Sequence, residues 1–593
     1  MSDAHIIPER AVLERARLFE KGGDLLKAYD VLVEGLAQHP DSRDLKHRAV
    51  LVLARAGAGE QARREFQRLG LAEAIDDEDV LALGGRLLKD LALAADGDAR
   101  RTLAADSAEN YARAYALHHG YYPGINTATM TLLAGDSGQA AKLANAVLLS
   151  LRQNNEPTPE QAYYVAATTA EAHLLCGRLE AADDALATAR ARNPRDYAAH
   201  ASTLRQFGII CEALALDSAW LDRHRPPPAL FYCGHMFNEG ANIADLHAEV
   251  RESLAVIRPG AVFGALAAGS DIIVAEAALA AGAELHVILP MREADYLTQS
   301  VAPYGAAWKA RYRSCVERAT TFRLATHEPF LGDDSVFAYG TEIAMGLAVR
   351  HADVLQTRAQ QLALWDGAAA AGVAGTGADI ARWEATGRRR TVIDFPKALR
   401  QPPAHKVVAA AVTITTARTP KAMLFADVRG FSKLEEHQIT LFVERILAPL
   451  AARLRGLSVQ PQEVATWGDG LYVVYDDVHA AATGALALLK RFSEIDLEGA
   501  GLPGHLALRV GGHAGPVTEL TDPFMGTKNF FGTHVIIAAR IEPVTVPGAL
   551  YVSEPFAALL SLSAPGRYRT DYVGQSELAK KFGAMRLFAV SEM

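Results

Sequence analysis

The stretch Lys421-Ala-Met-Leu-Phe-Ala-Asp427-Val-Arg-Gly430-Phe431-Ser432 decides the fold of the C-terminal part of the chain. Its apolar run predicts a buried strand that ends at a carboxylate. Gly430 then indicates a turn, and the polar segment opening at Ser432 is typical of a helix start. A helix start offers free N–H groups to phosphates, and an aspartate offers hard oxygen to a metal ion. We therefore predict a metal site at Asp427 and nucleotide contacts at Gly430, Phe431 and Ser432.

A second stretch of the same kind is Ala465-Thr-Trp-Gly-Asp469-Gly-Leu-Tyr-Val-Val-Tyr475. Its Gly-Asp-Gly turn leads into an apolar strand, which indicates a hairpin that could present Asp469 beside Asp427. A lone aspartate at a strand end is usually a turn residue. Two of them, each beside glycine and each on an apolar strand, favour a site for two Mg²⁺ or Mn²⁺ ions. Such ions could clamp a triphosphate and activate an attacking hydroxyl.

Three motifs follow one another in the order typical of one enzyme family: Phe-Ala-Asp427-Val-Arg-Gly-Phe-Ser, Trp-Gly-Asp469-Gly, and Phe-Phe-Gly532-Thr-His-Val535-Ile-Ile-Ala-Ala-Arg540-Ile-Glu. From about Lys421 onward the chain resembles the class III nucleotidyl cyclase catalytic domain. The resemblance implies an α+β ferredoxin-like fold and a homodimer paired head to tail. It also implies conversion of a nucleoside triphosphate, with ATP preferred, to a 3′,5′-cyclic monophosphate and pyrophosphate.

The same resemblance assigns roles to single residues. Asp427 and Asp469 would be the metal ligands. Arg540 would stabilise charge on the transferring phosphate. Lys581, chosen over Lys580, would bind the terminal phosphate.

The chain departs from the family pattern in the part that reads the base and orients the ribose. Ile536 follows Val535 where the family has an asparagine, and an aliphatic side chain cannot orient a ribose by hydrogen bonding. Ala465 stands where the family has a purine-reading lysine. The partner of that lysine falls near Asn529, which can still hydrogen-bond a base edge. Adenine and guanine are therefore not distinguished by these residues.

Length and composition limit the number of domains and the class of protein to which the whole chain can belong. Its 593 residues predict several domains, and its net charge of −9 argues against a general nucleic-acid binder. No apolar run has the length of a membrane span, and no signal peptide is visible. The scattered cysteines, with no C-x-x-C pair, fit a reducing compartment, so we expect a cytoplasmic protein. These cysteines are Cys176, Cys211, Cys233 and Cys315.

The sequence pattern of residues 1–222 predicts an all-α helical-repeat region. Small and apolar residues recur at helical spacing, and helix stops such as His39-Pro40 resemble those of tetratricopeptide repeats, which present a concave surface to a protein partner. The stretch from Tyr111 to Thr129 resembles the TRAFs-binding helical region. Packing at a helix junction also explains its His and Tyr residues.

Residues 229–393 predict an α/β Rossmann-like domain, set off by a proline-rich linker at 223–228. The run Val262 to Pro290 forms a βαβ pattern, and a second strand, acidic turn and helix follow around Asp366 and Gly375. Both resemble the SLOG superfamily of nucleotide-binding domains. We predict ligand contacts at Gly269, Ser270, Asp366, Gly375 and Thr376, although these glycines could equally make only tight turns.

A second linker at 394–406 leads into the cyclase-like domain at 407–593, which opens with a short strand at 407–414. Three functions are considered for the whole chain. The first is an active cyclase regulated by its helical and Rossmann-like domains. The second is a cyclase-homology protein that binds nucleotide without turnover, as a sensor or scaffold. A third places the chemistry in the middle domain, where Glu276 could serve an N-glycosidase but more simply is a solvated helix residue.

Overall fold

The structure is a computed structural model. It describes residues 7–21, 25–55, 59–153, 158, 161–194, 197–240, 242–405, 418–578 and 584–593. The chain divides into two compact units. One contains the residues up to Pro226 with the short segments 354–356 and 571–575, and the other contains the remainder from Pro227.

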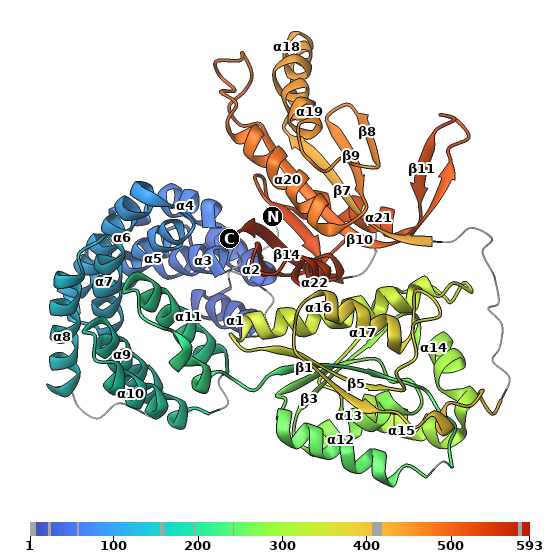
Figure 1. The fold of residues 1–593 in the computed structure, drawn as a ribbon. Coiled ribbons are helices and arrows are strands. Elements are labelled where there is room, and N and C mark those ends of the chain that lie inside the picture. Colours follow the sequence, from blue (N-terminus) through green and yellow to red (C-terminus); the bar gives the residue numbers. More distant parts are fainter. Residues whose placement is uncertain are drawn as a thin grey trace. The chain divides into compact units, whose positions relative to one another are not determined.

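The first unit consists of helices that pack on their neighbours in the chain (Figure 1). Its apolar residues form a series of small cores, each built by helices close in sequence. This is the arrangement expected of stacked helical repeats, because each repeat buries its apolar face only against the next. The helices are α1 (Glu9–Lys21), α2 (Leu25–Gln38), α3 (Arg43–Arg55), α4 (Gly59–Arg68), α5 (Glu78–Leu93), α6 (Gly97–His118), α7 (Tyr121–Leu133), α8 (Ser137–Gln153), α9 (Ala162–Leu175), α10 (Leu179–Arg192) and α11 (Tyr197–Ala213).

The second unit begins with a parallel sheet, the predicted α/β element of the middle region. Its strands are β1 (Ala229–Gly234), β2 (Ala261–Gly264), β3 (Glu284–Leu289), β4 (Thr321–Leu324), β5 (Ala359–Trp365) and β6 (Arg390–Asp394), in the order β4-β3-β2-β1-β5-β6. Because β1 pairs with both β2 and β5, the strand order reverses between β1 and β5. In open α/β sheets such a point is where ligands bind.

Helices cover both faces of this sheet. One apolar core involves α12 (Ala244–Ile257), α13 (Ser270–Ala280), α14 (Glu293–Ser300) and α15 (Ala306–Arg318). The other core involves α16 (Ser335–Val354) and α17 (Thr376–Ala385). The strands β1, β2 and β3 are therefore buried on both sides, which explains their continuous apolar runs.

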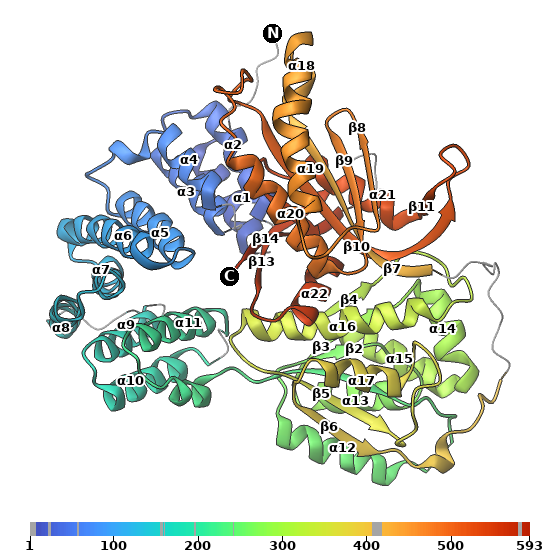
Figure 2. The same cartoon turned by 45° about the horizontal axis from the view of Figure 1, so that its top comes forward.

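The C-terminal part of the second unit is a mixed sheet, seen from two sides in Figures 1 and 2. Its strands run in the order β13-β14-β12-β10-β7-β9-β8, and β11 pairs with β10. Their bounds are β7 (Arg418–Arg429), β8 (Glu463–Trp467), β9 (Gly470–Tyr475), β10 (Ala507–Thr521), β11 (Lys528–Phe531), β12 (Leu550–Ser553), β13 (Tyr568–Glu577) and β14 (Ala584–Glu592). The helices are α18 (Glu436–Phe442), α19 (Ala448–Arg455), α20 (Val478–Ser493), α21 (Thr533–Ile541) and α22 (Glu554–Ser563).

Two expectations for this sheet need comment. The helix predicted to open at Ser432 is wrong in its start: Phe431–Lys433 is a single 3₁₀ turn, and α18 begins at Glu436. The reason is the capping box in which Glu435 and Gln438 each accept the other's backbone N–H, since this pair fixes the helix start. The strand predicted at 407–414 lies outside the described residues.

Helix α16 joins the two sheets of the second unit. Its apolar core includes Ala558 of α22, and a Cβ at Gly346 would collide with the backbone of Ala558. Just before the helix, Asp333 accepts hydrogen bonds of 2.7 and 3.1 Å from the guanidinium of Arg418, the first residue of β7. The parallel sheet and the mixed sheet are thus packed together with α16 between them.

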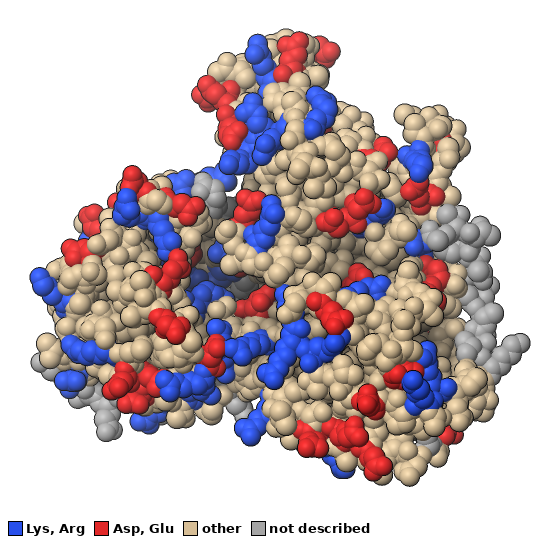
Figure 3. Space-filling view, in the orientation of Figure 1, with Lys and Arg blue, Asp and Glu red and all other residues tan. Residues whose placement is uncertain are grey.

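Lys and Arg side chains are interspersed with Asp and Glu on the face shown in Figure 3, without a large area of one sign. Within the described part of the chain, no helix is both long and apolar enough to cross a membrane.

Candidate active site

Asp427 and Asp469 lie together at one end of the mixed sheet. Asp427 is near the end of β7, and Asp469 sits in the tight turn between β8 and β9, where Gly468 has a φ of 68°. Since β9 pairs with β7 through Ala426 and Leu471, the turn falls beside the end of β7. Burial raises the pKa of Asp469 to about 6, helped by a hydrogen bond to Asp427 and by the charge of Asp427. The hairpin predicted from the sequence therefore brings the two carboxyl groups into contact.

The sequence reasoning missed two charged neighbours of this pair. Arg509 on β10 is opposite Asp427 in the strand register, and its Nη2 donates to Asp427 Oδ2 over 3.0 Å. Its Nε also pairs with Glu542 directly after α21. Burial raises the pKa of Glu542 to about 7; Arg509 opposes that rise, and the charges of Asp427 and Asp469 add to it. The available signal was an arginine inside the otherwise apolar strand 506–512, since a charge there needs a partner.

The other predicted catalytic and base-contacting residues lie on nearby elements. Arg540 is in the last turn of α21, and its Nε is buried without a hydrogen-bond partner among the described residues. Asn529 on β11 is held locally, because its Nδ2 donates to Asp522 over 3.4 Å and its Oδ1 accepts the N–H of Phe530. In the described residues neither side chain pairs with Asp427 or Asp469. Lys580 and Lys581 lie outside the described residues.

The predicted phosphate turn follows β7 directly. Gly430 has a φ of 96°, in the left-handed region that favours glycine, and a Cβ there would press on the ring of His505. Phe431 packs on Phe442 of α18, with ring centroids 4.8 Å apart. Ser432 lies in the 3₁₀ turn. The sharp turn therefore keeps backbone close to Asp427, although no α-helix starts there.

The donor set at this end of the sheet suits a hard divalent cation. Asp427 and Asp469 supply carboxylate oxygen, the ligand type that Mg²⁺ and Mn²⁺ prefer. Among the described residues, no group of three or more His, Cys, Asp and Glu side chains is arranged to hold a metal ion by itself. Ions bound by two aspartates would take their remaining ligands from substrate phosphates and water, as is usual for Mg²⁺.

Comparison with protein families identifies both ends of the chain. Residues 416–591 match the family model "Adenylate and Guanylate cyclase catalytic domain". This part of the chain, called the cyclase domain below, is similar to class III cyclase catalytic domains. Residues 26–131 match the family "Tetratricopeptide Repeats-Sensor". Both matches confirm resemblances predicted from the sequence, whereas the TRAFs-binding and SLOG resemblances stay predictions.

Solved structures similar to the cyclase domain cover about a third of the chain. The adenylyl cyclase CyaB from P. aeruginosa is 18% identical, covers 30% of this chain and 97% of its own, and has a TM-score of 0.27. The guanylate cyclase domain of RhGC from Catenaria anguillulae, solved with GTP, is 20% identical, with 29% and 97% covered and a TM-score of 0.25. An adenylate cyclase from Trypanosoma brucei is 21% identical, with 29% and 87% covered and a TM-score of 0.26. A search of curated proteins gives no match.

Only some of the residues predicted to bind a ligand in the parallel sheet line a cavity in the structure. Gly375 and Thr376, at the start of α17, line a cavity. Gly269 and Ser270 are not among its lining residues, because Gly269 is closed off by Phe237 and Ser270 is fully buried, donating to the carbonyl of His235. Asp366 is occupied by Arg400 and His235, which donate to it over 2.7 and 3.0 Å.

Glu276, considered above as a catalytic candidate, pairs with Arg311 of α15 over 2.5 and 2.9 Å. It is not among the residues that line the cavity. The pairing suits a structural helix residue.

Proposed function

We propose that the cyclase domain converts a nucleoside triphosphate, with ATP as the first candidate, to a 3′,5′-cyclic monophosphate and pyrophosphate. The observation that carries the proposal is that the hairpin of β8 and β9, paired with β7, brings the carboxyl group of Asp469 beside that of Asp427 at the end of the sheet. Two carboxyls in contact repel each other when ionised, and a divalent cation removes that penalty.

The chain's own groups divide the work around this pair. Asp427 and Asp469 would hold two Mg²⁺ or Mn²⁺ ions, which lower the pKa of the ribose 3′-hydroxyl and neutralise the phosphates. Arg509 now neutralises Asp427. If the carboxylate of Asp427 binds a metal ion instead of Arg509, the guanidinium of Arg509 becomes free to bind a phosphate group in the bidentate geometry that arginine favours. Gly430, Phe431 and Ser432 would approach the phosphates through their backbone N–H groups.

Completion of the site would come from a second copy of the chain. In a head-to-tail homodimer, Arg540 of one chain would face the aspartates of the other and stabilise charge on the transferring phosphate, with Lys581 at the terminal phosphate. Among the described residues of one chain, Arg540 does not pair with Asp427 or Asp469, and this supports such an arrangement. Asn529 would contact the base, once its local bond to Asp522 is exchanged for the ligand.

The alternative is a nucleotide-binding sensor or scaffold without turnover. Ile536 favours it, because this aliphatic side chain is 44% exposed on α21, one turn before Arg540. Ala465 on β8 offers no hydrogen bond to a base. We place the active enzyme first, since positioning by the remaining groups can supply much of the rate when one orienting group is missing.

Turnover of ATP, GTP, CTP and UTP tests the proposal directly. Each is incubated with Mn²⁺ or Mg²⁺, and the products are separated by chromatography. We expect a cyclic nucleotide from the intact protein and none from Asp427→Ala. Asp476→Ala is the matched control, because this exposed acid directly follows β9 and pairs with Lys421 and Gln462. Metal-dependent nucleotide binding without any cyclic product would favour the sensor.

The remaining parts would regulate this reaction. The helical repeats would present a surface to a protein partner. The parallel sheet would bind a nucleotide derivative, with Gly375 and Thr376 facing the ligand.

A further inference from the structure

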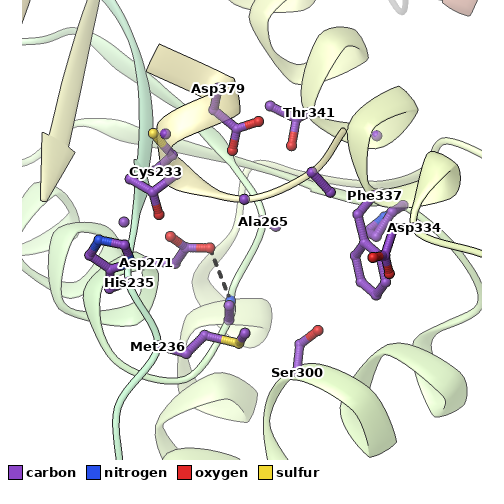
Figure 4. Close-up of a pocket in the computed structure, with 18 of the residues that line it drawn as sticks. Cys233, His235, Met236, Ala265, Asp271, Ser300, Asp334, Phe337, Thr341 and Asp379 are labelled. Atoms are coloured by element: carbon purple, nitrogen blue, oxygen red, sulfur yellow. Dashed lines mark hydrogen bonds between the residues drawn. The ribbon is translucent and has the colours of Figure 1, made fainter. Parts of the chain in front are cut away.

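A cavity of about 460 Å³ opens at the C-terminal ends of the parallel strands, where the strand order reverses between β1 and β5 (Figure 4). This volume is in the range of sites that take small organic molecules. Aromatic rings of Tyr296, Phe330 and Phe337 form part of its wall, and Asp271 and Asp379 line it from the first turns of α13 and α17. Ring surfaces with a few polar groups suit a flat ligand that carries hydrogen-bonding substituents.

One polar atom in this wall has no hydrogen-bond partner. Asp379 is only 7% exposed, and its Oδ1 receives no hydrogen bond from any described residue. The nearest cationic atom is Nη1 of Arg382, 3.6 Å away, beyond hydrogen-bond range. An unsatisfied buried carboxyl oxygen is costly, so a rotation of the Asp379 carboxyl group that brings Oδ1 to a hydrogen-bond donor of a ligand in the cavity would remove that cost.

Two backbone N–H groups and the basic side chains that could attract a phosphate are held by carboxylates of the chain itself. The carboxylate of Asp271 accepts the backbone N–H of Ala267 over 3.2 Å, and a backbone bond from Gly234 also stabilises its charge. The basic side chains Arg400 and His235, which also line the cavity, are both held by Asp366. Among the described residues that line the cavity, an incoming anion would therefore meet carboxyl groups and basic side chains that are already paired.

The carboxyl groups themselves favour an uncharged partner. Burial raises the pKa of Asp271 to about 8 and that of Asp379 to about 7, so both are partly protonated near neutral pH. A protonated carboxyl both donates and accepts a hydrogen bond, which matches hydroxyl and amino groups.

We propose that this cavity is an effector site for an uncharged molecule of nucleoside size, a flat ring with hydroxyl or amino donors, and that α16 carries its occupancy to the cyclase domain. The second half of this proposal rests on the function proposed above, whereas the first half does not.

Helix α16 has one face in the cavity and another on the cyclase domain. Phe337, Gly340 and Thr341 line the cavity, and Figure 4 shows Thr341 next to Asp379 and Phe337 next to Asp334. Between them, the hydroxyl of Tyr339 donates to the carbonyl of Ala514 on β10 over 2.9 Å. A shift of this helix against the cavity therefore moves a buried contact in the cyclase sheet.

The contact leads to the helix that carries Arg540. The ring of Tyr339 lies edge-on to that of His534, in the first turn of α21, with centroids 6.0 Å apart. His534 is hydrogen-bonded to His513 of β10 over 2.8 Å, and His513 to Ser553 over 2.6 Å. These groups are fully or almost fully buried, so α21 cannot move independently of α16.

A polar link runs beside this apolar one. Arg382, 3.6 Å from the unsatisfied oxygen of Asp379, also pairs with Glu342 of α16 through its Nε over 2.8 Å. A ligand bonded to Asp379 changes the balance of charge around Arg382 and so acts on α16 from the cavity side.

Ligand binding is tested first on the intact protein without divalent metal, by thermal shift and calorimetry. The probes are adenosine, guanosine, cytidine, uridine and their 5′-monophosphates. We expect at least one nucleoside to bind about tenfold or more tightly than its monophosphate. Asp379→Leu should abolish this binding and Asp379→Asn, which keeps the shape, should weaken it, whereas Asp427→Ala should leave it unchanged. Tighter binding of the monophosphate, or no binding of any nucleoside, would overturn the proposed ligand.

Coupling is tested by hydrogen exchange, which does not depend on turnover. We expect the bound nucleoside to change amide protection in α21 of the wild type. Tyr339→Phe should retain binding and lose this change, while Tyr551→Phe, which removes a buried hydroxyl without a described partner, should behave as the wild type. Unchanged protection of α21 in the liganded wild type would overturn the coupling. A protein that passes both tests but makes no cyclic nucleotide would refute the cyclase function alone.

Discussion

Breaking the ion pair between Asp333 and Arg418 tests how firmly the two sheets of the second unit are joined. The two side chains are only 13% and 7% exposed and share two hydrogen bonds. Asp333→Asn keeps the shape but leaves the guanidinium of Arg418 buried without a counter-charge. Removing one partner of a buried pair costs about 3–5 kcal/mol, and the partial exposure of Asp333 favours the lower end, about 3 kcal/mol.

Thermal unfolding of the intact protein measures this cost. For a part of 150–250 residues, such as the cyclase domain, about 3 kcal/mol corresponds to a fall in Tm of about 6–12 °C. The double variant Asp333→Asn with Arg418→Met should recover most of the loss, because no charge is then buried. Asp334→Asn is the matched control at the exposed neighbouring acid. A single variant with an unchanged Tm, or a double variant as unstable as the single one, would refute the reasoning.

The same pair gives a pH dependence. Although burial opposes it, the hydrogen bonds from Arg418 and Ser335 hold the pKa of Asp333 below its ordinary value of 3.8. The folded state therefore binds the proton of Asp333 less readily than the unfolded state. Its stabilisation is present above about pH 4 and is lost as the pH falls through the lowered pKa. We expect the Tm difference between wild type and Asp333→Asn to shrink below pH 4, and a constant difference would contradict this.

Three further predictions concern the catalytic pair and the packing of α16. Ile536→Asn should raise turnover about tenfold, which corresponds to a barrier lower by about 1.4 kcal/mol. The free energy of unfolding should change by less than about 1 kcal/mol, because the side chain is 44% exposed. Unchanged turnover would mean that this position does not limit the reaction. Chelation of divalent metal should stop turnover in the wild type, and Asp469→Asn should need a higher Mn²⁺ concentration for any that remains. Gly346→Val should lower the free energy of unfolding by about 1–3 kcal/mol through collision with Ala558, whereas Gly208→Ala, in open space on α11, should not lower it.

Much of the architecture could be predicted from local pattern. The apolar runs at 229–233 and 285–289 are strands buried on both faces, which is the pattern of a parallel sheet. The Gly-Asp-Gly turn around Asp469 specified its hairpin, since the turn residues demand that geometry. Short-range signals of this kind also placed the two aspartates together.

The parts that could not be predicted depend on partners distant in sequence. Arg509 and Asp427 are 82 residues apart, and Tyr339 and Ala514 are 175 apart. Nothing near Tyr339 distinguishes a core tyrosine from one that reaches another sheet. The helix start near Ser432 failed for a local reason, because the capping box at Glu435 outcompeted the earlier glycine turn.

Strand β10 has a consequence for how any signal could reach the catalytic pair. Arg509, beside Asp427, and His513, beside the Tyr339 contact, are four positions apart on this one strand, a span of about 14 Å at the rise of an extended chain. A hydrogen-bonded strand between two neighbours does not stretch along its length. Regulation through β10 must therefore occur by a rigid-body tilt of the strand, in which a small displacement near His513 shifts Arg509. It does not occur by a series of local rearrangements from one residue to the next.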